Sequence, residues 1–235
     1  MTLQAFRADA IDHLRWRLPE ISMLAASMAA WLALAARAGV HMHSAGAAAN
    51  WRHWMLMVAA MMLPLQVDKI RLTAERSLWS RRHRAALEYL VGYLSVWAAL
   101  GAPLSLAFTL LHIGHRVDWR LGTAMGLVIT AAWLVSPWKR VAARMCHRTA
   151  PLSAAGWEAD RDCICFGWLS GSTCALNCWP LMLVCWLSSH SFIAMLFSFV
   201  LSWIDRHFPP DYARNAAAVV VLALSFGLAG VFFQN

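Results

Sequence analysis

Long apolar runs separated by short polar and basic segments dominate the chain. A helix crosses a bilayer with about 20 mostly apolar residues at a rise of about 1.5 Å per residue. Seven runs approach that length, and each predicts a membrane-spanning helix. They are residues 19–40, 51–67, 87–111, 119–138, 163–187, 191–207 and 213–233. The pattern predicts an all-α, polytopic transmembrane bundle that forms a single domain over residues 1–235.

Lysine and arginine are distributed unevenly between the two sides of the predicted bundle. Sixteen of the 20 fall in the N-terminal segment and in every second connection, and four fall on the other side. Because cytoplasmic loops carry the excess of basic residues, this bias places the N-terminus in the cytoplasm. We therefore expect a multi-pass protein of a bacterial inner (plasma) membrane. The first apolar run also resembles a signal peptide with a cleavage site at Ala33-Leu34-Ala35, and that alternative stays open.

The composition agrees with a membrane protein. Apolar residues make up 60% and charged residues 14% of the chain, and the mean hydropathy is +0.53, whereas soluble domains average about 45–50% and about 25%. These values exclude a soluble globule, a disordered chain and a coiled coil. A net charge of +8 would suggest nucleic acid as the partner of a soluble protein. Here the basic residues flank apolar runs, so the lipid bilayer is the expected partner and nucleic acid is not.

The fifth apolar run carries cysteines at a spacing that one helical face can share. At about 100° per residue, four of them fall in a stripe about 60° wide. They are Cys163, Cys174, Cys178 and Cys185. Cys165 falls off the stripe. Cysteine is also a small apolar residue that packs well between helices, and Gly167-x-x-x-Gly171 marks a close-packing face here. Packing and metal ligation therefore remain alternatives for the stripe.

The second apolar run carries a methionine pattern of the same kind. His53, Met57 and Met61 fall on one helical face, and the two methionines are an i, i+4 pair whose thioethers could meet one ion. Met55 and Met62 share another face. Methionine is also a common gap-filler in apolar cores, so packing is again the alternative.

His41 and His43 follow the first apolar run at the predicted outer face and complete a gradient of soft donors. Histidine and methionine lie toward the outer mouth, methionine and cysteine inside, and cysteine near the cytoplasm. Imidazole, thioether and thiolate together favour copper(I) over hard ions, with zinc as the second choice. The candidate metal ligands are His41, His43, His53, Met57, Met61, Cys163, Cys174, Cys178 and Cys185.

Four stretches resemble a bacterial family described as predicted metal-binding integral membrane proteins, a domain of unknown function. They are WMLMVAAMMLP at 54–64, GYLSVW at 92–97, SPWK at 136–139 and CALNCWPLM at 174–182. The resemblance covers most of the chain from the second run through the sixth and implies a helical membrane fold that binds a metal. The sequence departs from the family at two thiol positions, which are Ala142 and Asn177 here, while Cys146 remains. The loss of two thiols argues against a full thiolate site and tight zinc binding.

Two functions of a non-enzymatic membrane protein follow. The first is to bind copper(I), either for transport across the membrane or for delivery to a partner copper-dependent enzyme. The second is to act as a structural or assembly subunit that packs against other membrane subunits, which the small-residue run at 213–230 would suit. A thiol–disulfide enzyme is disfavoured, because it needs a cysteine pair near the outer surface and only Cys185 lies near it. Haem ligation is disfavoured because almost every histidine lies at a predicted helix end.

Overall fold

A computed structural model of the chain describes residues 3–36, 46–111, 118–188, 191–207 and 220–221. Every regular element in these ranges is helical, which confirms the all-α prediction. The α-helices are α1 (Leu3–Ala35), α2 (Ala47–Met62), α3 (Val67–Arg76), α4 (Arg82–Leu110), α6 (Trp119–Val135), α7 (Pro137–Cys146), α8 (Gly156–Leu187) and α9 (Phe192–His207). Two 3-10 turns, η2 (Pro64–Gln66) and η3 (Trp79–Arg81), precede α3 and α4.

The described parts of six of the seven predicted runs are mostly helical, and the run at 213–233 falls outside the described residues except at positions 220 and 221. The main difference concerns the second run, predicted as one helix over 51–67. Here α2 ends at Met62 and the chain passes through η2 into α3. Pro64 explains the break, because its ring removes a backbone donor and clashes with the preceding turn. In contrast, α8 continues unbroken through Pro180.

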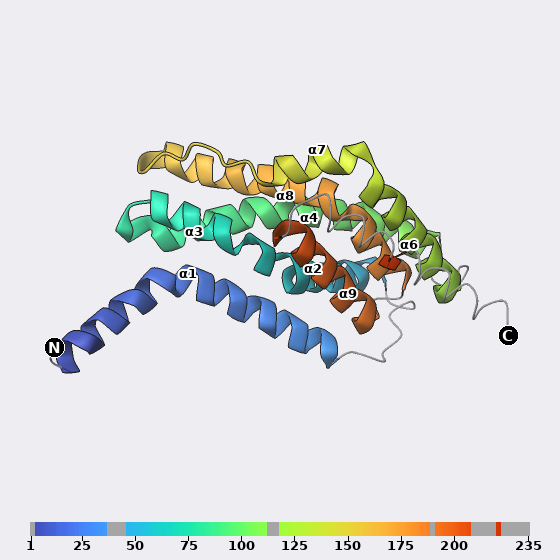
Figure 1. Cartoon of the computed structure of the whole chain (residues 1–235), viewed down its shortest axis with the longest axis horizontal. Helices are drawn as coiled ribbons and strands as arrows, with labels where there is room; N and C mark the ends of the chain where they lie inside the picture. Colours follow the sequence, from blue (N-terminus) through green and yellow to red (C-terminus); the bar gives the residue numbers. More distant parts are fainter. Residues whose placement is uncertain (1–2, 37–45, 112–117, 189–190, 208–219, 222–235) are drawn as a thin grey trace.

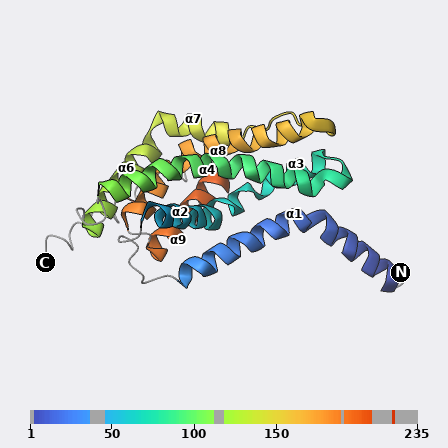
Figure 2. The same cartoon turned by 180° about the vertical axis from the view of Figure 1, so that it is seen from behind.

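The most extensive helix contact is between α4 and α8, which lie side by side (Figures 1 and 2). Glycines let the two backbones touch. A Cβ atom at Gly167 would overlap the carbonyl oxygen of Tyr89, and one at Gly92 would overlap that of Ile164. The close-packing face predicted at Gly167 and Gly171 is therefore confirmed. It fixes how the middle of α8 is presented to the rest of the bundle.

The remaining helices surround this pair. Figure 1 shows α1 along one edge with a bend, which Pro19 inside the helix explains. α2 packs against α1 and α4, and α9 packs against α8 and α2. α7 packs along α8 on the opposite side from α1 (Figure 1). The buried core between α2, α4, α8 and α9 includes Met57, Met61, Tyr93 and Cys174.

One described helix, α4 taken with its leading turn (Trp79–Leu110), is long and apolar enough to cross a membrane. α6 and α7 would make a second candidate, but the chain bends by 78° between them. The bend falls at Ser136, whose side chain accepts a hydrogen bond from the backbone N–H of Trp138 and so caps α7. The number of spans therefore stays a prediction.

The outward faces of α4, α6 and α9 carry large apolar side chains. Leu110, Val128, Val135 and Ile193 are between 49% and 79% exposed. A soluble monomer rarely exposes contiguous apolar surface of more than a few hundred Å². These faces are of the kind that lipid or another subunit covers.

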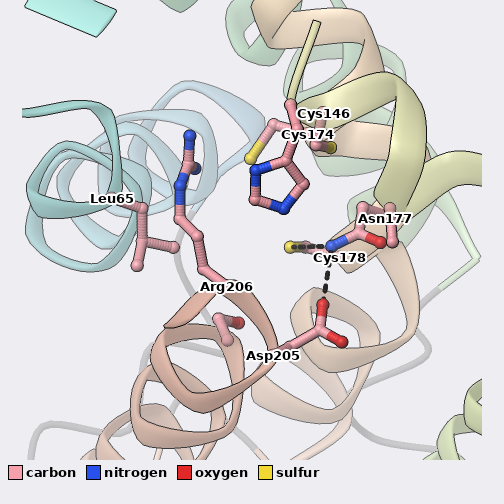
Figure 3. Close-up of a pocket in the computed structure, with 10 residues that line it drawn as sticks. Leu65, Cys146, Cys174, Asn177, Cys178, Asp205 and Arg206 are labelled. Atoms are coloured by element: carbon pink, nitrogen blue, oxygen red, sulfur yellow. Dashed lines mark hydrogen bonds between the residues drawn. The ribbon is translucent and has the colours of Figure 1, made fainter. Parts of the chain in front are cut away.

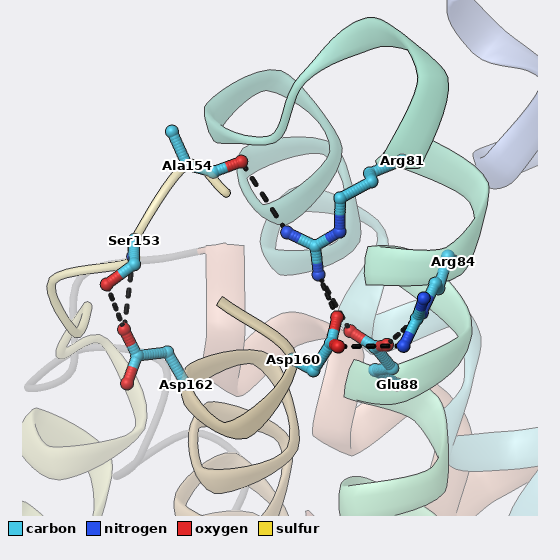
Figure 4. Close-up of polar contacts among 7 residues, drawn as sticks. All are labelled: Arg81, Arg84, Glu88, Ser153, Ala154, Asp160 and Asp162. Atoms are coloured by element: carbon cyan, nitrogen blue, oxygen red, sulfur yellow. Dashed lines mark hydrogen bonds and ion pairs between the residues drawn. The ribbon is translucent and has the colours of Figure 1, made fainter. Parts of the chain in front are cut away.

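A polar network joins the start of α4 to the start of α8 (Figure 4). Asp160 forms ion pairs with Arg81 and Arg84, and Arg84 also pairs with Glu88 at 2.8 Å between Nε and Oε1. The Arg84 side chain is 64% exposed, so water screens these pairs. The network aligns the two helices at this end and leaves their middle to apolar and sulfur contacts.

Candidate metal site

The cysteines of α8 lie as the helical arithmetic predicts. All four members of the stripe are buried, and Cys165 is exposed. The stripe nevertheless extends far along the helix axis. Eleven residues separate Cys163 from Cys174, which corresponds to about 16 Å at about 1.5 Å per residue. Of these four, only Cys174 and Cys178, which lie one turn apart, are placed to share an ion.

A small cavity lies beside this pair, between α7, α8, α9 and η2 (Figure 3). Its volume is about 20 Å³, enough for one water-sized sphere. The residues around it are Leu65, Ala143, Cys146, His147, Cys174, Asn177, Cys178, Ser202, Asp205 and Arg206. Three of the six cysteines in the chain therefore line one cavity.

Cys146 is not among the metal ligands that the sequence predicts. It ends α7, is 9% exposed, and its Sγ donates to the carbonyl oxygen of Thr173 at 3.1 Å. Burial raises the pKa of this thiol to about 11, so it is protonated at neutral pH. The sequence does carry a signal for Cys146. The related family has two cysteines in this segment, and Cys146 is the one that this chain keeps. Its approach to α8 depends on the bend between α6 and α7, which periodicity does not predict.

Polar side chains from α4 and η2 surround Cys174. The hydroxyl of Tyr93 donates to Cys174 Sγ at 3.2 Å, and that of Tyr89 donates to Gln66 Oε1 at 2.9 Å. Gln66 Nε2 lies 3.3 Å from Tyr93 Oη and 3.9 Å from Cys174 Sγ. All four residues are buried. The sulfur therefore sits in a preorganised polar shell within an otherwise apolar core.

A methionine also contacts Cys174, but it is not one of the predicted pair. Met62 Sδ lies 3.9 Å from Cys174 Sγ. Met57 and Met61 are completely buried in the same core, and His53 is buried near the other end of α2. The face assigned to Met55 and Met62 thus supplies a thioether that contacts Cys174. His41 and His43 lie outside the described residues.

A second polar cluster holds Cys178 from the side of α9 (Figure 3). Asn177 Nδ2 donates to Cys178 Sγ at 3.7 Å and to Asp205 Oδ2 at 3.0 Å. Lys139 Nζ forms an ion pair with the same carboxylate at 2.7 Å and donates to Asn177 Oδ1 at 2.9 Å. Asn177 occupies the position where the related family has a cysteine. The amide thus replaces a thiol and ties α7, α8 and α9 together.

The donors surround the cavity without converging to coordination distance. Within the part of the chain that the structure describes, no three His, Cys, Asp or Glu side chains are grouped closely enough to hold a metal ion. Cys163 and Cys185 lie apart from the cavity, and Cys185 Sγ is 3.4 Å from Ser198 Oγ. The chemistry of the lining is that of soft ligands, because thiolate and thioether sulfur select copper(I) among common metal ions.

Comparison with known proteins identifies the family. A family model described as PpoB2, copper chaperone, matches residues 51–230, which is more than half of the chain. Neither a comparison with curated proteins nor one with solved structures gives a match. The matched range contains most of α2 and all three cysteines of the cavity. The chain therefore belongs to the PpoB2 copper chaperone family.

Proposed function

We propose that this protein is a membrane-embedded chaperone that binds copper(I) at the Cys174–Cys178 pair, with Cys146 as a third ligand, and delivers it to a copper-dependent enzyme. The observation that carries the proposal is the convergence of these three thiols on one small cavity in a member of a copper chaperone family. Copper(I) accepts two or three sulfur ligands, which suits a chaperone that must also release its cargo. Copper is the cargo, so the protein itself performs no catalysis.

The arrangement of the pair supports binding with easy exchange. Cys174 and Cys178 come from adjacent turns of one rigid helix, whereas Cys146 comes from the end of α7. A thiol must lose its proton to become a ligand. The hydrogen bond from Cys146 to Thr173 must therefore break when this thiol joins the ion. A third ligand that binds at the expense of another contact is well suited to being displaced by a partner.

The membrane location is part of the proposal. It is supported by the outward apolar faces of α4, α6 and α9 and by the length and apolarity of α4. His147 and Arg206, beside the cavity, belong to the predicted cytoplasmic side, so the cavity would lie near that end of the bundle. Fusion of reporters after residues 77 and 115 tests this, because the first should report cytoplasm and the second periplasm.

The function is tested by anaerobic copper(I) titration of the detergent-purified protein against a chromophoric chelator. Wild type should take up one copper(I) per chain, and Cys178→Ser should lose it. Cys165→Ser is the matched control, because Cys165 is an exposed thiol of the same helix. Uptake that Cys178→Ser leaves unchanged would contradict the assignment. A stoichiometric partner together with no copper uptake would favour the structural-subunit function instead.

A further inference from the structure

The charged groups at the cavity do not cancel. Asp205 and Arg206 both line it, and the Asp205 carboxylate is already paired with Lys139. Among the described residues, Arg206 takes part in no ion pair. Figure 3 shows its side chain extending from α9 along the wall opposite Asn177. Arg206 is half-buried, and Asp205, the carboxylate that lines the cavity with it, is paired with Lys139.

Lys69 adds a second cation from α3. Its side chain is buried, with Nζ 3.0 Å from the hydroxyl of Ser170, one turn before Cys174. Burial raises the pKa of the Cys146 thiol, and the positive charges of Lys69 and Arg206 act in the opposite direction. Arg206 in the cavity wall and Lys69 in the adjoining core are thus two cations close to the cysteines, and neither forms an ion pair among the described residues.

The charge of a metal–thiolate complex depends on the metal. Copper(I) bound by two cysteines displaces one proton from each thiol to solvent, and the product carries one negative charge with no change of oxidation state. Zinc(II) bound by the same two thiolates gives a neutral complex. Uncompensated charge is costly away from water. A third thiolate from Cys146 would lower the charge of both complexes by one, so with the same ligands the copper(I) complex is always one charge more negative than the zinc(II) complex. Nearby cations therefore stabilise the copper(I) complex more.

We propose that Arg206 and Lys69 are specificity-determining residues, which make the thiol cavity select monovalent copper(I), bound as an anionic thiolate complex, against divalent zinc(II). This inference rests on the proposed function and assigns the metal preference to cations that do not touch the metal. Sulfur ligands alone bind both ions, so discrimination requires a further feature of the site. The excess positive charge supplies it.

The test compares copper(I) and zinc(II) affinities of the full-length protein in detergent, each measured by competition with a chromophoric chelator. Arg206→Gln should weaken copper(I) binding by at least about 10-fold, because a unit charge within about 12 Å has an effect of that size at an effective dielectric constant of about 20. Zinc(II) affinity should stay the same or rise. Lys69→Met, which replaces a buried ammonium with an apolar chain of similar length, should move the ratio in the same direction.

Two further variants separate charge from structure. Arg206→Lys keeps the cation and should retain the wild-type ratio. Arg140→Gln makes the same charge change on the exposed side of α7 and should leave both affinities unaltered. If Arg206→Gln and Lys69→Met weaken the binding of both metals equally, or leave the ratio of the copper(I) and zinc(II) affinities unchanged, the inference is overturned. The proposed copper binding itself would stand. A wild-type protein that binds no copper(I) would overturn the proposed function, and this inference with it.

Discussion

The centre and the two ends of the cysteine stripe in α8 differ in what surrounds them. At the centre, Cys174 and Cys178 adjoin a cavity and are contacted by side chains from η2, α2, α4 and their own helix. At one end, Cys185 contacts Ser198 and the backbone of α9, and at the other Cys163 is buried near the charged groups that join the starts of α4 and α8. A shared helical face places all four thiols in the core, but only the central pair combines donors from other helices with free space, as a metal site requires.

The largest effect should come from replacing the two cysteines at the centre of the stripe with serine. Cys174→Ser/Cys178→Ser should abolish copper(I) uptake, a loss beyond the roughly 10- to 100-fold that removing an outer-shell partner costs. Cys163→Ser/Cys185→Ser is the matched double variant from the ends of the stripe and should bind copper(I) within about threefold of wild type, since neither thiol adjoins the cavity. Chelator competition measures both. Equal losses in the two double variants would mean that the whole stripe carries the ion.

The ion pair beside the centre of the stripe and the ion pairs at its Cys163 end should also differ in how much they stabilise the protein. Asp205→Asn leaves Lys139 almost completely buried without its counter-charge, and should destabilise the protein by about 3–5 kcal/mol. Arg84→Gln, in the exposed network of Figure 4, should cost at most about 1 kcal/mol. Thermal unfolding in detergent compares the two. Similar shifts in melting temperature would show that the pair beside the cavity is as well hydrated as the exposed one.

Close approach of α4 and α8 should matter next, because it presents the centre of α8 to Tyr93 and Gln66. Gly167→Ala forces a methyl group against the carbonyl oxygen of Tyr89 and should cost about 1–3 kcal/mol of stability. Gly46→Ala is the control, since no atom lies within 4 Å of the added carbon. Thermal unfolding measures both changes. An unaffected melting temperature for Gly167→Ala would show that the helices are less tightly packed than described.

The smallest effect should distinguish the methionines. Met62→Leu removes the thioether next to Cys174 and should weaken copper(I) binding by a few-fold, less than the roughly 10-fold lower bound for an outer-shell metal partner. Met57→Leu conserves core volume equally well and should have no effect on affinity. Chelator competition again provides the measurement. The reverse order would support the predicted Met57–Met61 pair in place of Met62.

Sequence periodicity predicted the helices and the buried cysteine face because both depend on local geometry. The spacing of Cys163, Cys174, Cys178 and Cys185 sufficed to place all four inside. It could not predict which of them adjoin a cavity, since that depends on where another helix ends.

Two further features of the site depend on breaks in the chain and on distant partners. Cys146 reaches α8 through the 78° bend at Ser136. The Lys139–Asp205 pair joins residues 66 positions apart, which no periodicity links. Helical arithmetic separates the face of Met62 from that of Met57 and Met61. It leaves open which of the two faces meets α8.

The most direct test of the central claim is X-ray absorption spectroscopy at the copper edge of the copper(I)-loaded protein. The account predicts a first shell of two or three sulfur atoms, because Cys174, Cys178 and Cys146 line the cavity. In Cys146→Ser the shell should fall to two sulfur atoms, and in Cys165→Ser it should be unchanged. A first shell dominated by nitrogen or oxygen, or one indifferent to Cys174→Ser and Cys178→Ser, would contradict the claim that this thiol cavity holds the ion.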